Sequence, residues 1–201
     1  MTARRLNTVK EYYFSEKLRY VASMVAAGNP VINIGIGSPD LPPHPKVVAA
    51  LKKSFDHPKV HQYQSYQGVP ELRQAIADFY QEHYQYNANP VSEILPLMGS
   101  KEGIMHISMA FLNPGDKVLI PNPGYPTYQS VTRLVEAEPV FYDLNAENQW
   151  QPNFDALDQM DLYNVKLMWV NYPHMPTGAI AQRDTFEKLI VWAKEKDILL
   201  V

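Results

Sequence analysis

The sequence has no cysteine, no long apolar run and no excess of charge of either sign. Without cysteine the chain can form no disulfide, no thiolate nucleophile and no cysteine-based zinc site. No segment approaches the roughly 20 apolar residues that a membrane-spanning helix needs. Its 18 basic and 21 acidic residues are scattered and leave a net charge of −3, which argues against nucleic acid or membrane as a partner. We therefore expect a cytoplasmic protein without a metal site.

Glycine is also scarce, whereas proline and tyrosine are abundant. The chain has 9 Gly against 17 Pro and 13 Tyr, in 201 residues that are 46% hydrophobic. Such a chain is long enough to bury a core. Prolines of this number usually punctuate loops, and tyrosines gathered in loops often line a pocket in which a flat ligand stacks.

The hydrophobic pattern alternates between the helical and the extended period. We expect helices over residues 13–27, 100–112, 126–135, 154–160 and 184–196, with two more opened by Pro45 and Pro70. Strands are expected over residues 31–36, 94–98, 117–120, 140–142, 165–170 and 198–201. Strands that alternate with helices predict an α/β fold with a mainly parallel, buried sheet.

The last four residues predict the opening of a buried parallel strand. In open α/β sheets the ligand-binding groups lie just beyond the carboxyl ends of the strands. A natural domain rarely stops at such a point, and we expect the chain to be truncated at Val201.

Three strand-to-helix loops carry the candidate chemistry. In the first, Gly99, Ser100 and Lys101 stand where a strand passes into a helix, and free backbone N–H groups there would form a phosphate cradle. Taken alone, this motif is more often an ordinary turn with Ser100 as the N-cap. The nucleotide-binding patterns G-x-x-x-x-G-K-[ST] and G-x-G-x-x-G are absent.

The second and third loops follow the next strands. Tyr125 and Tyr128 lie after the strand at 117–120, and singly each is more often a packing residue. Residues 171–178 form a proline-bound turn after the strand at 165–170. Parallel strands bring their carboxyl ends to one edge of the sheet, so the three loops predict a ligand crevice.

Five motifs in order resemble the first half of a class I/II aminotransferase, a pyridoxal-phosphate enzyme of the aspartate aminotransferase fold. They are Gly35-Ile-Gly-Ser-Pro-Asp40, the run from Tyr63 through Gly68 to Arg73, Gly99-Ser-Lys101, Pro123-Gly-Tyr-Pro126 and Asn171-Tyr-Pro-His-Met-Pro-Thr-Gly178. The resemblance covers nearly the whole chain. It implies a three-layer α/β/α large domain and transfer of an amino group between an amino acid and a 2-oxo acid.

The resemblance also implies site residues. Gly99, Ser100 and Lys101 would hold the phosphate of pyridoxal phosphate, and Tyr125 would stack on its ring. Tyr63 would reach the phosphate in the neighbouring subunit of a homodimer, and Gly37 would lie near the substrate carboxylate. Residues 1–44 would form an N-terminal arm and small-domain segment, and residues 45–201 the first part of the large cofactor-binding domain.

One position departs from the family. Relatives have asparagine where this chain has Met175, and that asparagine donates a hydrogen bond to the phenolic oxygen of the cofactor. Methionine can line the cofactor pocket but cannot donate this bond, so either Asn171 or His174 replaces it, or the internal imine of the cofactor titrates differently. Taken singly, His174 is more often a structural residue than a catalyst.

The catalytic residues themselves are unknown. In relatives the cofactor-binding lysine, the aspartate that pairs with the ring nitrogen and the arginine that binds the substrate carboxylate all come later in the chain. We therefore expect the 201 residues alone to be inactive. Two alternatives stay open: another pyridoxal-phosphate enzyme of the same fold, such as a lyase or decarboxylase, and a non-catalytic phosphate-binding fragment.

Overall fold

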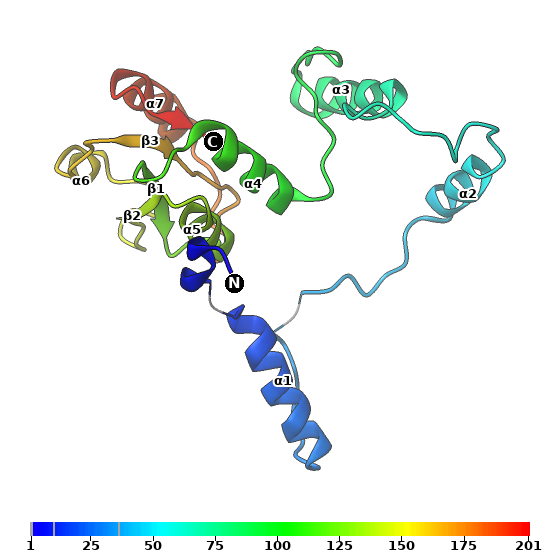
Figure 1. The fold of residues 1–201 in the computed structure, drawn as a ribbon, viewed down its shortest axis with the longest axis horizontal. Helices are drawn as coiled ribbons and strands as arrows, with labels where there is room; N and C mark the ends of the chain where they lie inside the picture. Colours follow the sequence, from blue (N-terminus) through cyan, green and yellow to red (C-terminus); the bar gives the residue numbers. More distant parts are fainter. Residues whose placement is uncertain (1, 10, 36) are drawn as a thin grey trace. The chain divides into compact units, whose positions relative to one another are not determined.

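The computed structural model describes residues 2–9, 11–35 and 37–201 (Figure 1). It divides into two compact units. Unit 1 combines Met1–Lys10 with Leu97–Val201, and unit 2 is Glu11–Pro96. The predicted division into an N-terminal arm with a small-domain segment (residues 1–44) and a large-domain segment (residues 45–201) stays a prediction.

Unit 1 is built on a parallel sheet of four strands, which confirms the predicted fold class. The strands are β1 (Lys117–Asn122), β2 (Glu138–Asp143), β3 (Val165–Met168) and β4 (Leu199–Leu200). Their order is β2-β1-β3-β4, and every pair is parallel. Along the chain, α4 (Ser100–Phe111) precedes β1. The helices α5 (Pro126–Leu134), α6 (Phe154–Asp158) and α7 (Arg183–Glu195) connect successive strands. Parallel strands need such crossovers.

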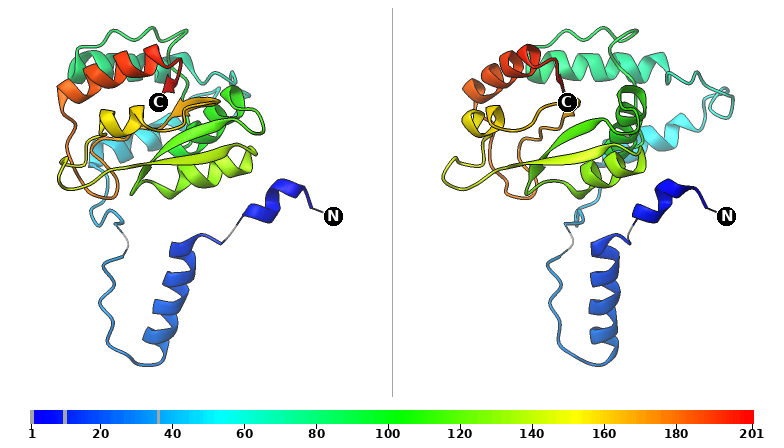
Figure 2. Two further views of the ribbon diagram at one scale, coloured as in Figure 1. Left: turned by 90° about the vertical axis from the view of Figure 1, so that its left-hand side faces the viewer. Right: turned by 60° about the vertical axis from the view of Figure 1, so that its left-hand side comes forward.

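Two apolar cores cover the two faces of this sheet. Along β1 the side chains alternate, so that Val118 and Ile120 face one way and Leu119 the other. Val118 and Ile120 pack in one cluster with residues of α4 and α5, whereas Leu119 packs in a second cluster with residues of α6 and α7. The ribbon shows these helices beside the sheet (Figures 1 and 2). Unit 1 therefore has three layers, and its central strand is buried on both faces.

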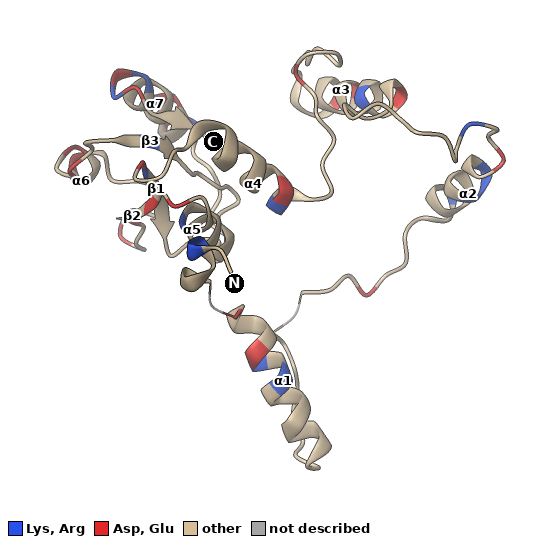
Figure 3. Ribbon diagram, viewed as in Figure 1, with Lys and Arg blue, Asp and Glu red and all other residues tan. Residues whose placement is uncertain are grey.

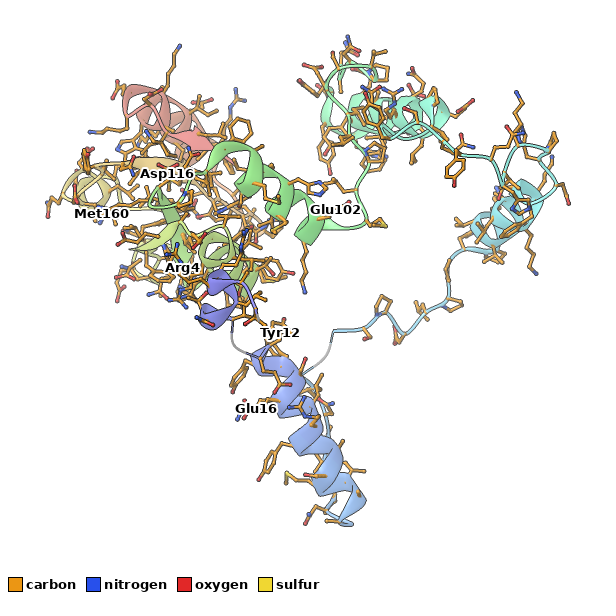
Figure 4. All side chains as sticks on the ribbon, viewed as in Figure 1. Arg4, Tyr12, Glu16, Glu102, Asp116 and Met160 are labelled. Atoms are coloured by element: carbon orange, nitrogen blue, oxygen red, sulfur yellow. The ribbon has the colours of Figure 1, made fainter. Side chains whose placement is uncertain are left out.

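The 3-10 helix η1 (Arg4–Thr8) belongs to unit 1, where it contacts α5. The Arg4 guanidinium lies 2.7 Å from the Glu136 carboxylate just beyond α5 (Figure 4). This ion pair is largely exposed on the Arg4 side, and such pairs contribute little stability.

Unit 2 contains three helices that the sequence predicts correctly: α1 (Tyr13–Ala26), α2 (Pro45–Ser54) and α3 (Pro70–Tyr84). Pro45 and Pro70 each occupy the first turn of their helix, where the missing N–H is not needed. Arg73 of α3 is buried and donates to the Pro90 carbonyl at 3.0 Å, which ties the turn after α3 to the helix.

Two predicted strands are wrong. Residues 31–35 and residues 94–98 have no strand conformation, and Ile36 lies outside the described residues. A strand exists only where its backbone pairs with a neighbour, and the described strands form a single sheet to which neither segment pairs. Pro96 also removes one backbone donor from the second segment. An apolar run alone is therefore not enough to predict a strand in these two segments.

Charged residues are interspersed along the elements of both units (Figure 3). Among the described residues no helix is long and apolar enough to cross a membrane. In the same part of the chain, no three His, Asp or Glu side chains gather as metal ligands would.

Candidate functional site

The candidate site lies at the carboxyl edge of the sheet in unit 1. β1 and β3 are parallel neighbours, so the loops that follow Asn122 and Met168 leave the sheet on the same side. The peptide bonds before Pro123, Pro173 and Pro176 in these loops are cis. Tyr125 belongs to the first loop, and Asn171 and Met175 to the second.

The first turn of α4 has the geometry of an anion cradle. Gly99 is the N-cap, with φ 97° and ψ 162°, a conformation open only to glycine. A Cβ atom at Gly99 would meet no atom within 4 Å, so the space over the helix start is open. Ser100 and Lys101 are exposed there. The alternative reading of Ser100 as the N-cap is wrong, because Gly99 takes that place.

Contacts on both sides fix this helix start. The Glu102 carboxylate accepts a hydrogen bond from the Met98 N–H, a variant of the capping box (Figure 4). Gly103 lets Leu97 pack closely, because a Cβ there would lie 2.6 Å from Leu97 Cδ1. Within the described residues no hydrogen bond engages the Ser100 hydroxyl or its backbone N–H. Every helix start leaves its first N–H groups without an intrahelical acceptor, so these two donors are compatible with the predicted phosphate but do not by themselves show it.

Three aromatic rings in contact connect the loop after β1, the first turn of α5 and the residue that follows β3. Tyr125 is half-buried and meets Tyr128 edge-on, with ring centroids 5.7 Å apart. Tyr128 is buried and stacks on Trp169 at 4.9 Å with an interplanar angle of 12°. Tyr128 is therefore a packing residue, and burial raises the pKa of its hydroxyl. Tyr125 keeps part of its ring accessible and can still stack on a ligand.

The helix start and the stack share one core. Ile104, one turn into α4, belongs to the same apolar cluster as Tyr128 and Trp169, and Tyr125 packs against that cluster. The helix that carries the predicted phosphate motif and the predicted ring-stacking residue therefore pack against the same apolar cluster. Their roles toward a cofactor remain predictions.

The third motif forms a closed turn around His174. The Asn171 side-chain oxygen accepts the Met175 N–H at 3.1 Å, so its NH₂ group is the part that remains to donate to another partner. Met175 is 51% exposed. His174 is 2% exposed, and its Nδ1 lies 2.8 Å from the Thr177 hydroxyl. Of the two candidates for the missing donor, Asn171 is half-buried and His174 is enclosed.

Two predicted site residues, Tyr63 and Gly37, lie in unit 2. Tyr63 is fully exposed. Gly37 lies in an extended loop, and a Cβ there would meet no atom within 4 Å. Their roles in the site stay predictions.

Sequence reasoning missed the supports beneath the site. The buried Tyr142 hydroxyl donates to the Trp169 carbonyl at 2.7 Å, which pins the end of β3. Asn122 donates to Asp143 at 2.8 Å where β1 and β2 end. A tryptophan and a tyrosine at strand ends could have suggested packing, but no local pattern predicts that they contact each other.

Known proteins resemble this chain over almost its full length. It is 40% identical over 198 residues to an LL-diaminopimelate aminotransferase of Syntrophobacter fumaroxidans, which covers 98% of this chain and 51% of that protein. It is 37% identical over 196 residues to the enzyme of that name from Aquifex aeolicus, covering 98% and 51%. The chain thus spans about half the length of the curated relatives it matches.

Solved structures share the fold. The apo structure of BacF from Bacillus subtilis superposes with a TM-score of 0.92 at 38% identity, covering 100% of this chain and 51% of that one. An alanine aminotransferase of Pyrococcus furiosus reaches 0.90 at 27% identity, covering 100% and 51%. Residues 29–201 match the family model described as aminotransferase class I and II. Because this match extends over most of the chain, the protein belongs to the class I and II aminotransferase family.

Proposed function

We propose that the whole protein is a pyridoxal-phosphate-dependent aminotransferase that moves an amino group between an amino acid and a 2-oxo acid. The observation that carries the proposal is the 40% identity to an LL-diaminopimelate aminotransferase across 98% of the chain. The geometry of the α4 start supports it, because the family motif for the cofactor phosphate coincides with an open, glycine-capped helix N-terminus.

The residues present fit the cofactor. In this proposal the Ser100 hydroxyl and N–H would donate hydrogen bonds to its phosphate, and the Lys101 ammonium would pair with it. When bound, the cofactor supplies an electron sink for bond breaking at the substrate α-carbon. Tyr125 orients the ring by stacking on its face. These residues bind and orient, and none of them supplies the nucleophilic lysine that the chemistry requires.

Asn171 is the better replacement for the family asparagine at position 175. The Asn171 oxygen already accepts the Met175 N–H, so its NH₂ group is the part that remains to donate to a ligand. His174 is turned into the protein instead. We infer that Asn171 donates to the phenolic oxygen of the cofactor and that Met175 contributes only apolar contact.

Tyr63 and Gly37 complete the proposal from unit 2. Tyr63 would bind the cofactor phosphate of a second copy in a cytoplasmic homodimer, and its full exposure supports this. Gly37 would let the backbone pass close to the substrate carboxylate. Because LL-diaminopimelate is the substrate in the names of several relatives, it is the amino acid to test first.

Met175 keeps a second candidate open. Since this residue departs from the family at a position that touches the cofactor, another pyridoxal-phosphate reaction of the same fold, such as a lyase or decarboxylase reaction, is the alternative.

Amino transfer by the full-length protein tests the proposal. The protein is mixed with pyridoxal phosphate, a 2-oxo acid and either LL-diaminopimelate or alanine, and the new amino acid is measured by chromatography. The proposal predicts a new amino acid in amounts exceeding the enzyme, and borohydride treatment of the loaded enzyme should abolish its formation. Release of ammonia or carbon dioxide without a new amino acid would instead support the alternative.

A further inference from the structure

Tyr172 stands directly after Asn171 in the turn of residues 171–178, and the proposed function gives it no role. Its ring is half-buried and meets Phe186 of α7 edge-on, with ring centroids 5.8 Å apart. Its hydroxyl donates a hydrogen bond to the Trp150 carbonyl at 2.6 Å. Burial raises the pKa of this hydroxyl to about 12, so it keeps its proton at neutral pH and stays a donor. Contacts therefore hold both the ring and the hydroxyl.

The carbonyl that accepts this bond lies in a segment of uncommon backbone conformation. Gln149 and Trp150 have φ values of 52° and 58°, in the left-handed region that residues other than glycine seldom adopt. The Trp150 N–H donates to the Asn145 carbonyl at 2.8 Å, and its side chain packs against the apolar cluster that contains Leu119. Such a conformation persists only where the surrounding contacts hold it. We call residues 149–151 the supporting segment.

The supporting segment also contacts the chain beyond the turn. Gln151 is 7% exposed, and its side-chain NH₂ group donates to the Gln149 carbonyl at 3.1 Å and to the Ile180 carbonyl at 3.2 Å. The Gln182 side-chain NH₂ group donates to the Gln149 side-chain oxygen at 2.7 Å. The supporting segment is thus hydrogen-bonded to Tyr172 near the start of the turn and to Ile180 and Gln182 after its end.

Asn171 lies between two neighbours that are held in place. On its amino side, the Val170 N–H donates to the Val201 carbonyl at 2.8 Å. On its carboxyl side, Tyr172 is held by the supporting segment. The Asn171 side-chain oxygen itself accepts the Met175 N–H. Rotation of the backbone at Asn171 would break at least one of these contacts, so the direction of its NH₂ group depends on Tyr172.

We propose that Tyr172 is a positioning residue, whose hydrogen bond to the Trp150 carbonyl sets the orientation in which Asn171 presents its amide to the phenolic oxygen of the cofactor. This inference rests on the proposed function, because Tyr172 acts through Asn171. It also gives a role to the left-handed residues Gln149 and Trp150, which lie outside all five sequence motifs.

The first test needs no cofactor. Hydrogen exchange of the 201-residue chain, followed by mass spectrometry, measures how often the hydrogen-bonded amides of residues 145–151 and 171–180 open. Tyr172→Phe keeps the ring and removes only the hydroxyl. We expect exchange in both segments to accelerate by about 3- to 10-fold, the size of one neutral hydrogen bond. Unchanged exchange in either segment would overturn the proposal, whatever the chain binds.

Trp192→Phe is the matched control. The Trp192 Nε1–H donates to the Asp158 carboxylate at 3.0 Å, so this variant also loses one hydrogen bond of unit 1 and keeps an aromatic ring. Trp192 lies in the last turn of α7 and Asp158 ends α6, and each helix leads to the amino end of the next strand, away from the ligand loops. Equal acceleration in Trp192→Phe and Tyr172→Phe would show a general loss of stability and would contradict a local role of Tyr172.

The second test follows the ionisation of a bound ligand. The absorbance of pyridoxine 5′-phosphate changes when its phenolic hydroxyl loses the proton, and a donor from Asn171 stabilises the phenolate and lowers the midpoint pH of this titration. Asn171→Ala should raise the midpoint by about one pH unit, as expected for one hydrogen bond to a charged oxygen. Tyr172→Phe should raise it by roughly 0.3–0.7 pH units, because the donor is present but less well aligned. Trp192→Phe should leave it unchanged.

The double variant decides whether Tyr172 acts through Asn171. Once Asn171→Ala has removed the amide, Tyr172→Phe should not move the midpoint further. Additive shifts, or no shift in Asn171→Ala, would overturn the proposal. A chain that binds no pyridoxine 5′-phosphate would contradict the proposed function and with it the role toward the cofactor, and hydrogen exchange would still decide whether Tyr172 holds the turn.

Discussion

Replacing Lys101 with methionine should weaken binding of pyridoxine 5′-phosphate by about 10- to 100-fold, the effect expected for loss of one hydrogen bond to a charged group. This ligand has the ring and phosphate of the cofactor but no aldehyde that could react with surface lysines. Lys101 stands in the first turn of α4, where the helix dipole adds to the attraction of its ammonium for a dianion. Isothermal titration of the 201-residue chain measures the change.

Lys194→Met is the matched control. Lys194 also lies on a helix of unit 1, in the last turn of α7, and its loss changes the net charge equally. Its affinity should stay within about 2-fold of the original, because exposed charges farther apart than roughly 8–10 Å are screened at physiological salt. An equal fall in both variants would show a general charge effect and would contradict a phosphate site at Lys101.

Gly124→Ala should destabilise unit 1 and weaken ligand binding together. A Cβ atom at Gly124 would lie 2.2 Å from the Pro121 carbonyl oxygen, which is backbone and cannot swing aside. The loop that carries Tyr125 must therefore shift. We expect the free energy of unfolding to fall by about 1–3 kcal/mol, as for overpacking elsewhere, and the stacking surface for the ligand to be misplaced.

Gly115→Ala is the control for a loss of stability that leaves the ligand loops unchanged. Gly115 has φ 88° and a Cβ there would meet no atom within 4 Å, so alanine adds strain without a collision. It precedes β1, at the amino end of the strand and away from the ligand loops. This variant should lose stability by about 1–2 kcal/mol and keep its ligand affinity once folded. Denaturant unfolding and titration of the two variants give the comparison, and unchanged binding in folded Gly124→Ala would contradict the assigned role of Tyr125.

Much of the fold could be predicted because the signals are local. Prolines that open α2, α3 and α5 mark helix starts, and short apolar runs such as the one at Val118, Leu119 and Ile120 mark a strand buried on both faces. The strands predicted over residues 31–36 and 94–98 are wrong because strand formation there depends on a distant partner and not on a local signal. Their apolar residues resemble strands, but strand formation depends on a partner that no local pattern reveals.

The candidate site was predictable only at its motifs. Gly99 could be recognised because glycine in front of a helix implies a special backbone conformation, and its φ of 97° agrees. The enclosure of His174 and the stacking of Tyr128 on Trp169 could not be predicted, because both depend on residues that the sheet brings together from distant parts of the chain. Exposure, which separates Tyr125 from Tyr128, is likewise a property of packing.

The most direct test of the central claim compares two ligands on the same chain. Pyridoxine 5′-phosphate and pyridoxine share the ring, and only the first has the phosphate that Gly99, Ser100 and Lys101 are proposed to hold. Titration of the 201-residue chain should give binding of pyridoxine 5′-phosphate at least 10-fold tighter than that of pyridoxine, as expected for charge-assisted bonds. Equal affinity for the two ligands, or no binding of either at millimolar concentration, would contradict a cofactor site at the start of α4.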